Sequence, residues 1–284
     1  MADILKGKPV VDALNDELKN RSDALTAAGT APTLAIVRLG ERPDDMAYER
    51  GALKRAEKTG VAVKQFIFPA DMTQDELLEQ IDAINKDSSI HGVLMFRPLP
   101  KHIDDEIVRN ALAPEKDVDG ITDISQAGVY AGVAKGFPPC TAEACIEILD
   151  YYGYDMTGKN VAVIGRSQVI GKPVAMMLIK KNATVTVCHT RTKNTADICR
   201  DKDVIIAAAG HLGTVQNDFL SEGQVVIDVA INFTEDGKMC GDVADFDAAS
   251  EIVAAITPVP GGVGSVTTSM LMKHVIEAAE RAAK

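Results

Sequence analysis

The sequence predicts an α/β protein of two lobes, each built on a parallel β-sheet. Short runs rich in Val and Ile alternate with longer segments whose apolar residues recur at helical spacing, a pattern typical of parallel sheets. The chain has 284 residues, which is more than one small domain needs and fits two medium-sized domains. The alternation breaks at Pro138–Thr141, which suggests the boundary between the lobes.

Two series of expected elements make up the lobes. In the first, Gly60 ends a helix, and Thr73 with Glu76 forms a capping box that begins another. The first series has helices at 9–28 and 45–59 and strands at 33–39, 61–68 and 92–96. The second has a helix at 141–152, strands at 160–164, 183–188, 204–208 and 225–229, and a final helix at 266–284. We expect a small-molecule site in a cleft between the lobes.

The composition argues against several other classes of function. The net charge of −11 would repel nucleic acids and anionic membranes, so neither is expected as a partner. The five cysteines include no Cys-x-x-Cys pair, which argues against a disulfide framework and a zinc site, and we expect no metal. Free thiols, an N-terminus unlike a signal peptide and the lack of about 18 consecutive apolar residues indicate a cytoplasmic protein.

A glycine-containing loop in the second lobe is typical of dinucleotide binding. Gly165 follows the strand expected at 160–164, and Gly171 begins a helical run. In such a strand–loop–helix unit, backbone N–H groups and the helix N-terminus face a pyrophosphate. Because the glycine spacing differs from G-x-G-x-x-G, a plain turn between strand and helix is the alternative.

The residues that follow the next strand favour NADP over NAD. Sites for NAD place an acid about 20 residues past the glycines, where it binds the ribose 2′-hydroxyl. The segment 187–192 contains no acid here. Thr190, Arg191 and Arg166 could instead bind a 2′-phosphate. The alternatives are that both arginines are solvated surface charges and that His189 caps or packs within its loop.

A second loop, Thr257–Gly264, contains two prolines and three glycines in eight residues. This composition fixes a tight backbone path. Ordering such a loop costs chain entropy, and we expect that cost where the backbone must approach a ligand or another lobe. An ordinary connection to the last helix is the alternative.

Four segments together resemble the methylenetetrahydrofolate dehydrogenase/cyclohydrolase family, nearly from end to end of the chain. They occur in the family's order and are Pro114–Gly120, Phe137–Thr141, Gly165–Pro173 and Thr257–Gly264. The resemblance implies a homodimer with two domains in each chain. It implies a folate-binding catalytic domain of residues 1–139 that receives the closing helix 266–284, and a Rossmann-like NAD(P)-binding domain of residues 140–265.

The resemblance also assigns site residues. Asp119 is expected to hold the pterin ring of a tetrahydrofolate substrate, because a carboxylate can accept two parallel hydrogen bonds from it. Tyr48 is expected to stack on the pterin, and both residues are candidate catalytic residues. Further substrate contacts are expected from Phe96, Pro98, Pro260, Gly261 and Gly262. Cofactor contacts are expected from Gly165, Arg166, Ser167, Gly171, His189, Thr190, Arg191 and Ile231. A merely polar turn at 117–120 is the alternative for Asp119.

The chain departs from the family pattern close to this tyrosine. The family sequence is Tyr-x-x-x-Lys, whereas Ala52 stands four residues after Tyr48. Lys54 lies about 200° around the helix from that position and should point elsewhere. The family's Val-Gln-Leu-Pro motif also differs, so that Phe96 replaces the glutamine that partners the lysine.

These replacements concern only one of the family's two reactions. Oxidation of methylenetetrahydrofolate depends mainly on positioning, whereas hydrolysis of the methenyl product requires proton transfer by a positioned group. We therefore expect dehydrogenase activity in one-carbon metabolism, with NADP or alternatively NAD, and weak or absent cyclohydrolase activity. Asp45, which replaces a serine, could act as a substitute base, but Arg97 is always charged and suits that role poorly.

Three alternatives stay open at this point. Substituted side chains could preserve both family reactions. The chain could instead bind folate and dinucleotide without catalysis, although two intact glycine loops argue against this. A Rossmann dehydrogenase for another metabolite would need a proton acceptor, for which only His189 and His211 are candidates in the second lobe, and we expect both to be structural.

Overall fold

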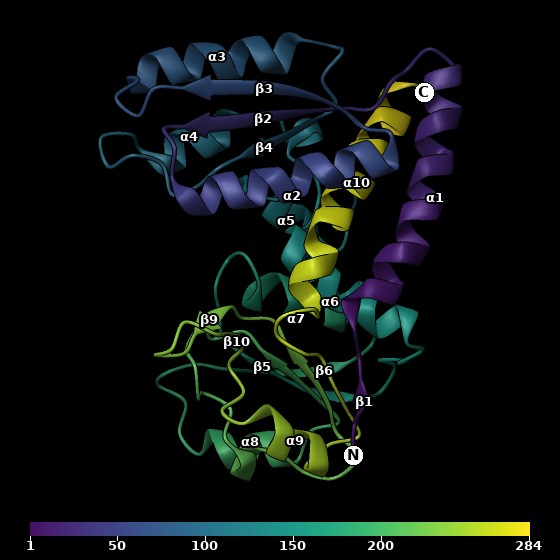
Figure 1. Cartoon of the computed structure of the whole chain (residues 1–284), viewed down its shortest axis with the longest axis vertical. Coiled ribbons are helices and arrows are strands. Elements are labelled where there is room, and N and C mark those ends of the chain that lie inside the picture. Colours follow the sequence, from purple (N-terminus) through teal and green to yellow (C-terminus); the bar gives the residue numbers. More distant parts are fainter. The chain divides into compact units, whose positions relative to one another are not determined.

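The computed structural model describes residues 1–284, which divide into two compact units (Figure 1). The six-stranded unit comprises Met1–Asp12 and Thr141–Thr267, and the three-stranded unit comprises Ala13–Cys140 and Thr268–Lys284. Residues 268–284 thus lie in the three-stranded unit, as expected for the closing helix. Residues 1–12 lie in the six-stranded unit, whereas the sequence-based prediction placed them in the first lobe. The reason is that β1 (Asp3–Ile4) pairs with β11 (Ala255–Ile256) in the larger sheet.

The six-stranded unit is built on a fully parallel sheet in the order β1-β11-β8-β7-β5-β6. Its four longer strands are β5 (Asn160–Ile164), β6 (Thr184–Cys188), β7 (Val204–Ala207) and β8 (Val225–Asp228). The central strands β7 and β8 are buried throughout, which is why they are almost continuous runs of Val, Ile and Ala. The other elements are α6 (Cys140–Tyr151), α7 (Gly171–Lys180), α8 (Thr195–Arg200), η2 (Asn217–Phe219), α9 (Phe246–Ile252) and the antiparallel pair β9 (Asn232–Phe233) and β10 (Met239–Cys240).

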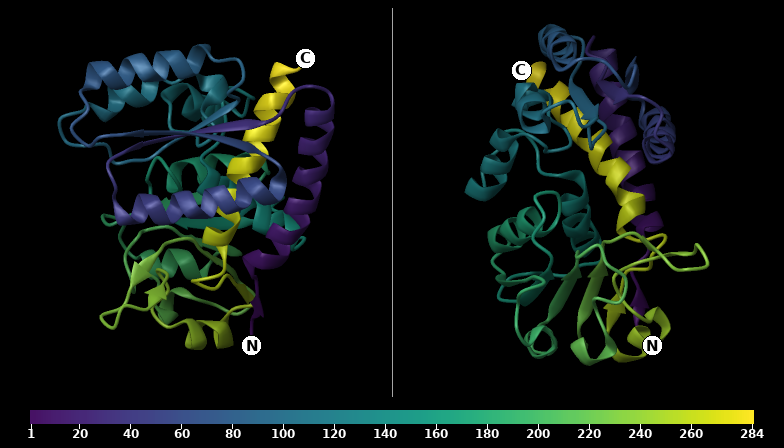
Figure 2. Two further views of the ribbon diagram at one scale, coloured as in Figure 1. Left: turned by 45° about the horizontal axis from the view of Figure 1, so that its top comes forward. Right: turned by 90° about the vertical axis from the view of Figure 1, so that its left-hand side faces the viewer.

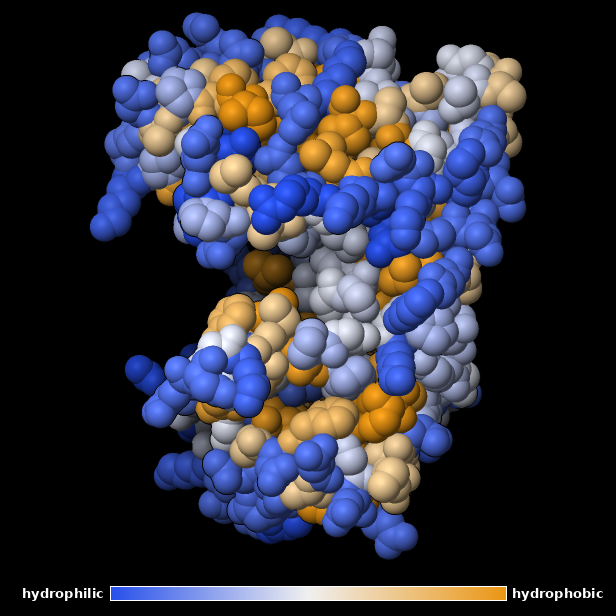
Figure 3. All heavy atoms as spheres, viewed as in Figure 1, coloured by the Kyte–Doolittle hydropathy of each residue, from blue (hydrophilic) through white to orange (hydrophobic).

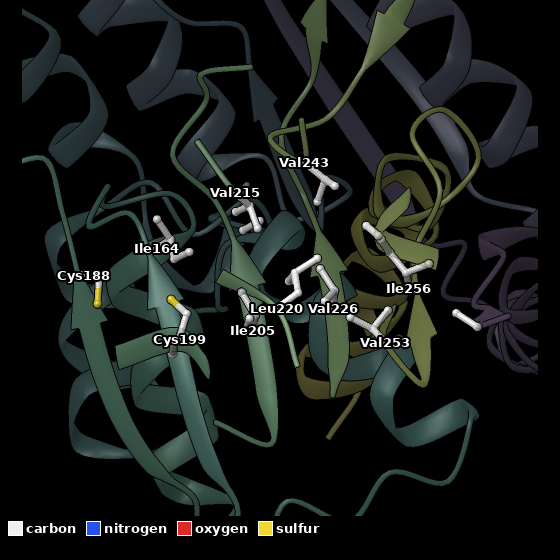
Figure 4. Close-up of a cluster of buried hydrophobic side chains, with 14 residues drawn as sticks. Ile164, Cys188, Cys199, Ile205, Val215, Leu220, Val226, Val243, Val253 and Ile256 are labelled. Atoms are coloured by element: carbon white, nitrogen blue, oxygen red, sulfur yellow. The ribbon is translucent and has the colours of Figure 1, made fainter. Parts of the chain in front are cut away.

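One face of this sheet carries a buried apolar cluster (Figure 4). Ile164, Ile205 and Val226 come from the adjacent strands β5, β7 and β8, and Cys199 and Val253 pack against them from α8 and from the end of α9. Close packing of this kind fixes the strands relative to one another. The loops that follow β5, β6, β7 and β8 therefore leave the same edge of the sheet in a fixed order.

The three-stranded unit contains a parallel sheet in the order β3-β2-β4. Its strands are β2 (Thr33–Leu39), β3 (Ala62–Phe68) and β4 (Gly92–Met95). Ala35, Val37 and Leu39 share a core with α3 (Gln74–Lys86) and α4 (Asp105–Ala111). On the other face, Arg38 forms an ion pair at 2.7 Å with Glu49 of α2 (Pro43–Thr59). Figure 2 shows these helices on either side of the sheet.

The helix ends follow the local sequence signals. Thr73 and Glu76 form the predicted capping box at the start of α3. Gly60 ends α2 in the left-handed conformation with φ of 73°, which glycine adopts without strain. The long helices α1 (Gly7–Ala27) and α10 (Val263–Ala282) are joined by an ion pair at 2.9 Å between Arg21 and Glu280. No helix combines the length and the apolar character needed to cross a membrane.

The prediction omitted several short elements. They include α4, α5 (Asp123–Ala131), α8, α9 and the 3-10 turn η1 (Pro114–Lys116). Each has too few residues to show a helical repeat of apolar positions. Asp104, Thr122 and Asp245 nevertheless accept hydrogen bonds from first-turn N–H groups of α4, α5 and α9, so cap residues rather than periodicity mark these helices.

Candidate active site

The three-stranded unit brings Tyr48, Phe96 and Asp119 together. Tyr48 projects from α2, and its ring meets the ring of Phe96 edge-on, with centroids 6.0 Å apart and planes at 83°. Burial and the nearby charge of Asp119 raise the pKa of the Tyr48 phenol well above 10. The phenol therefore stays protonated at neutral pH, and the ring offers an uncharged surface beside a carboxylate.

The loop that carries Asp119 is held by a second carboxylate. Asp117 is fully buried and accepts hydrogen bonds from the N–H groups of Ile121 at 2.9 Å and Thr122 at 2.8 Å. Gly120 has φ of 66°, and a side chain there would lie 2.5 Å from the nitrogen of Pro139. The segment 117–122 is therefore a tightly anchored loop that fixes the position of Asp119.

The Asp119 carboxyl is only partly accessible, and its surroundings shift its titration. The pKa of this carboxyl is raised to about 6, because burial and the charge of Asp117 raise it by more than the hydrogen bond from the Cys140 thiol lowers it. Asp119 is therefore largely ionised at pH 7. An ionised carboxylate can accept two hydrogen bonds from an amidine-like edge such as that of a pterin ring.

Two further residues of this cluster, Cys140 and His274, were not identified from the sequence. The Cys140 thiol donates to the carbonyl of Val118 at 3.2 Å, and His274 Nδ1 donates to the same carbonyl at 2.7 Å. The His274 ring also stacks on Phe137 at 5.0 Å. Cys140 lay within the matched motif 137–141 and could have been noticed, whereas nothing in the local sequence of α10 marks His274.

The positions that depart from the family pattern lie near the same cluster. Ala52 is completely buried in α2, whereas Lys54 is exposed. Asp45 is buried, and the Arg42 Nε lies 3.9 Å from its carboxylate. Burial raises the pKa of Asp45, and the charges of Arg42 and Arg38 oppose this shift.

Arg97 and Pro98 complete the sequence-predicted residues on this unit. The Arg97 guanidinium forms two hydrogen bonds with the Asp105 carboxylate at the start of α4, one of them at 2.6 Å from Nε. The Pro98 carbonyl accepts a hydrogen bond from Arg42 at 3.0 Å. Arg97 is thus a paired cation, in keeping with its poor suitability as a base.

In the six-stranded unit, the loop after β5 rests directly on the loop after β7. Gly165 has φ of 127°, and a Cβ there would lie 2.1 Å from the carbonyl oxygen of Ala208. A Cβ on Gly171 would lie 2.2 Å from the carbonyl oxygen of Gly165. Both glycines are therefore required by close backbone packing, and Gly171 is the first residue of α7.

Hydrogen bonds made by His189 stabilise the neighbouring loop, which follows β6. The Arg191 N–H donates to His189 Nδ1 at 3.1 Å, and the His189 N–H donates to the Thr192 hydroxyl at 2.9 Å. Gly165 joins the two loops by donating to the carbonyl of Cys188 at 2.9 Å. His189 thus has the capping arrangement that the sequence left open as an alternative.

The side chains around these loops suit a phosphorylated ligand. Arg166, Ser167, Thr190 and Arg191 are all exposed on loops that meet at one edge of the sheet. Two guanidinium groups and two hydroxyl groups are a donor set that fits phosphate oxygens. No cluster of three or more His, Cys, Asp and Glu side chains is arranged to bind a metal ion.

A cavity of about 290 Å³ lies beside the same edge of the six-stranded sheet. It is lined by Asp228–Ile231, Met239 and Pro258–Ser265. It therefore brings Ile231 together with Pro260, Gly261 and Gly262. Near it, the β9–β10 pair exposes Phe233 and Met239, and Figure 3 shows apolar atoms over this pair.

The chain matches two family profiles that together cover most of its length. The profile of the tetrahydrofolate dehydrogenase/cyclohydrolase catalytic domain matches residues 5–119, and that of its NAD(P)-binding domain matches residues 139–283. The fold and sites thus define a two-domain enzyme with a catalytic domain and an NAD(P)-binding domain.

Full-length relatives identify the family. The chain is 49% identical to the "Bifunctional protein FolD" of Clostridioides difficile, with 97% of this chain and 96% of the relative aligned. It is 50% identical to the protein of the same name from Carboxydothermus hydrogenoformans, with 99% and 98% aligned. The chain belongs to the methylenetetrahydrofolate dehydrogenase/cyclohydrolase family.

Solved structures agree with this assignment. The bifunctional enzyme FolD from Campylobacter jejuni superimposes with a TM-score of 0.96 at 37% identity, over 99% of both chains. The Trypanosoma brucei FolD, solved with NADP cofactor and inhibitor, gives a TM-score of 0.92 at 34% identity, over 100% of this chain and 99% of that one. The predicted fold class and family are confirmed.

Proposed function

We propose that this protein oxidises 5,10-methylenetetrahydrofolate to 5,10-methenyltetrahydrofolate with NADP. The observation that carries the proposal is that the ionised, partly accessible Asp119 carboxylate lies near the neutral phenol ring of Tyr48. The carboxylate would accept hydrogen bonds from the pterin edge, and the Tyr48 ring would lie against the pterin face. Both residues are needed to orient the substrate.

The protein's contribution to the oxidation is positioning. NADP, when bound, supplies the hydride acceptor. Arg166, Ser167, Thr190 and Arg191 would hold its phosphates, and the absence of an acid at 187–192 favours NADP over NAD.

We further propose that hydrolysis of the methenyl product is weak. Ala52 presents a buried methyl group where the family has an amine, and Phe96 presents an apolar ring where it has an amide. Neither side chain can transfer a proton. The second candidate function is the full bifunctional one, which the similarity to full-length bifunctional FolD proteins favours. In that case Asp45 is the candidate replacement base, because it is buried on α2 and, unlike the buried Glu49, is not in a close ion pair with Arg38.

Two spectrophotometric assays on the purified chain test these proposals. The first follows reduced cofactor formed from methylenetetrahydrofolate with NADP and with NAD. We expect faster turnover with NADP, and no reduced cofactor with either would contradict the dehydrogenase proposal. The second follows loss of methenyltetrahydrofolate, and hydrolysis well above the spontaneous rate would favour the bifunctional candidate.

If hydrolysis is rapid, replacement of Asp45 with Asn distinguishes its source. Loss of hydrolysis with unchanged oxidation would assign proton transfer to Asp45. The homodimer stays a prediction of the family resemblance, and the cytoplasmic location stays a prediction of the sequence. Sedimentation of the pure protein measures the oligomeric state.

A further inference from the structure

A buried carboxylate in the six-stranded unit holds three consecutive backbone N–H groups of one loop. Asp242 lies just after β10 and is completely buried. Its carboxylate accepts hydrogen bonds from Ala209 at 2.6 Å, from Gly210 at 3.1 Å and from His211 at 2.8 Å. These three residues form the loop that leaves β7 at the carboxyl edge of the sheet, where ligands of parallel sheets bind.

Such a row of N–H groups is an arrangement that often binds an anion. Here the anion is the protein's own side chain, so these groups are already satisfied. Asn232 supplies a fourth hydrogen bond to the same carboxylate at 3.1 Å and ties it to β9. The position of the 209–211 loop therefore depends on the β9–β10 pair.

The held loop supports the glycine loop next to it. The Gly165 backbone packs so closely on the carbonyl of Ala208 that a Cβ would approach it to 2.1 Å. The Ala208 N–H in turn donates to the carbonyl of Ile164 at 2.8 Å. A shift of the 209–211 loop would be transmitted to Gly165 through this contact.

A second buried carboxylate holds Asp242 in place. Asp228 accepts hydrogen bonds from the N–H groups of Asp242 and Val243, each at 3.0 Å. Its Oδ2 lies so close to Gly241 that a Cβ there would approach it to 2.0 Å. Asp228 also lines the cavity beside the Pro258–Ser265 segment. The two carboxylates thus link the cavity wall to the loop beneath Gly165.

We propose that Asp242 is a positioning residue for dinucleotide binding, acting through the 209–211 loop on the glycine loop at 165–171. The inference rests on the proposed function, because it requires a dinucleotide at this edge of the sheet. Asp242 itself would touch no ligand. Its role is to fix the surface on which the phosphate-binding loop rests.

Replacement of Asp242 with Asn tests the proposal with nearly the same side-chain volume. One carboxylate oxygen serves Ala209 and Gly210, and the other serves His211 and Asn232. In the Asn side chain an NH₂ group replaces one of these two oxygens. That group is a donor and cannot accept the hydrogen bonds that the oxygen accepted. We expect the Kd for reduced NADP to rise roughly tenfold, as loss of charge-assisted hydrogen bonds at a supporting loop would predict. The KM for methylenetetrahydrofolate should stay within about twofold.

The fluorescence of reduced NADP itself reports binding. The matched control is replacement of Asp245 with Ala. Asp245 caps α9 through the N–H of Ala248 at 3.0 Å, so its loss lowers stability without touching the 209–211 loop. We expect the control to lower the unfolding temperature and leave the Kd unchanged.

The outcomes separate the inference from the proposed function. An Asp242→Asn protein that binds reduced NADP like the wild type would overturn the inference, and so would an equal loss of affinity in the Asp245→Ala control. If the wild type binds no dinucleotide, the proposed function itself fails. Should Asp242→Asn not fold, Asn232→Ala removes one of the four hydrogen bonds, and we expect a weaker loss of about two- to threefold. An unchanged Kd in that variant would contradict the proposal.

Discussion

The two units build their sites in different ways. In the six-stranded unit, the backbone makes most of the site, with glycines packed against carbonyl oxygens and carboxylates that hold backbone N–H groups. In the three-stranded unit, side chains make the site, since Tyr48 and Asp119 present the groups that would bind substrate. Ala52 and Phe96, where the resemblance leads us to expect departures from the family pattern, lie in the three-stranded unit.

This difference shows which kinds of site tolerate replacement. A backbone-built site is weakened if one Cβ is added, because neighbouring main chain cannot move away cheaply. A side-chain site can exchange one residue for another and keep its fold. Ala52 is buried in α2 and Phe96 packs beside Tyr48, so the two side chains fit a compact site.

The largest expected effect comes from restoring the family's two side chains together. In the double variant Ala52→Lys and Phe96→Gln, hydrolysis of methenyltetrahydrofolate should rise by on the order of 10²-fold, the usual contribution of a positioned acid or base. The oxidation rate should change much less. The measurement is the loss of methenyl absorbance at saturating substrate.

Ala47→Lys is the matched control, because Ala47 lies on the same helix with its side chain exposed. Equal hydrolysis in the control and the double variant would mean that added positive charge, rather than a positioned amine, is responsible. No gain in the double variant would show that the two positions do not explain weak hydrolysis.

The next effect concerns the carboxylate of the three-stranded unit. Replacement of Asp119 with Asn should raise the KM for methylenetetrahydrofolate by on the order of 10²-fold, because two charge-assisted hydrogen bonds to the pterin are weakened. The KM for NADP should be unchanged. An unaltered KM for methylenetetrahydrofolate would show that Asp119 does not take part in substrate binding.

The pH dependence of substrate binding provides an independent measure. Because the pKa of Asp119 is about 6, its charge is lost as the pH falls through that value, and the folate KM of the wild type should rise there. The Asn variant should lack this rise. Since the folded-state pKa lies above the ordinary 3.8, the contribution of Asp119 to stability is lost as the pH increases from about 4 through 6. At pH 7 the unfolding temperature of the Asp119→Asn variant should therefore be at least as high as that of the wild type.

A smaller effect is expected from the backbone-built site. Gly165→Ala must displace the carbonyl of Ala208, so the Kd for NADP should rise about tenfold. Gly158→Ala is the control, because its φ of 72° carries the same kind of strain but a Cβ there meets nothing within 4 Å. Equal losses in both variants would attribute the effect to backbone strain alone.

The smallest effect is one on stability. Gly51 lies in the interior of α2 and a Cβ there meets nothing within 4 Å, so Gly51→Ala should raise the free energy of unfolding by about 0.5–1 kcal/mol. Chemical denaturation measures it. A loss of stability would mean that this exposed side of α2 is packed against something, such as a second subunit.

Much of the fold follows from the sequence because the strands and long helices carry strong local patterns. The strands β2 and β5 have the predicted bounds, α2 and α6 lie within a few residues of theirs, and α3 begins at the predicted cap residue Thr73. The loop glycines could also be identified, since positive φ and close packing restrict those positions to glycine. Asp119 and Tyr48 could be named because the family resemblance extended to their motifs.

Other features were decided only by the tertiary structure. Strand β1 is two residues long, and its place beside β11 depends on a partner far away in the chain. The same holds for His274, which reaches Val118 from the last helix, and for Asp242, which holds a loop about thirty residues earlier. A sequence pattern reports the periodicity of nearby residues, whereas a buried polar group is explained by the partner that satisfies it, and only the folded chain brings the two together.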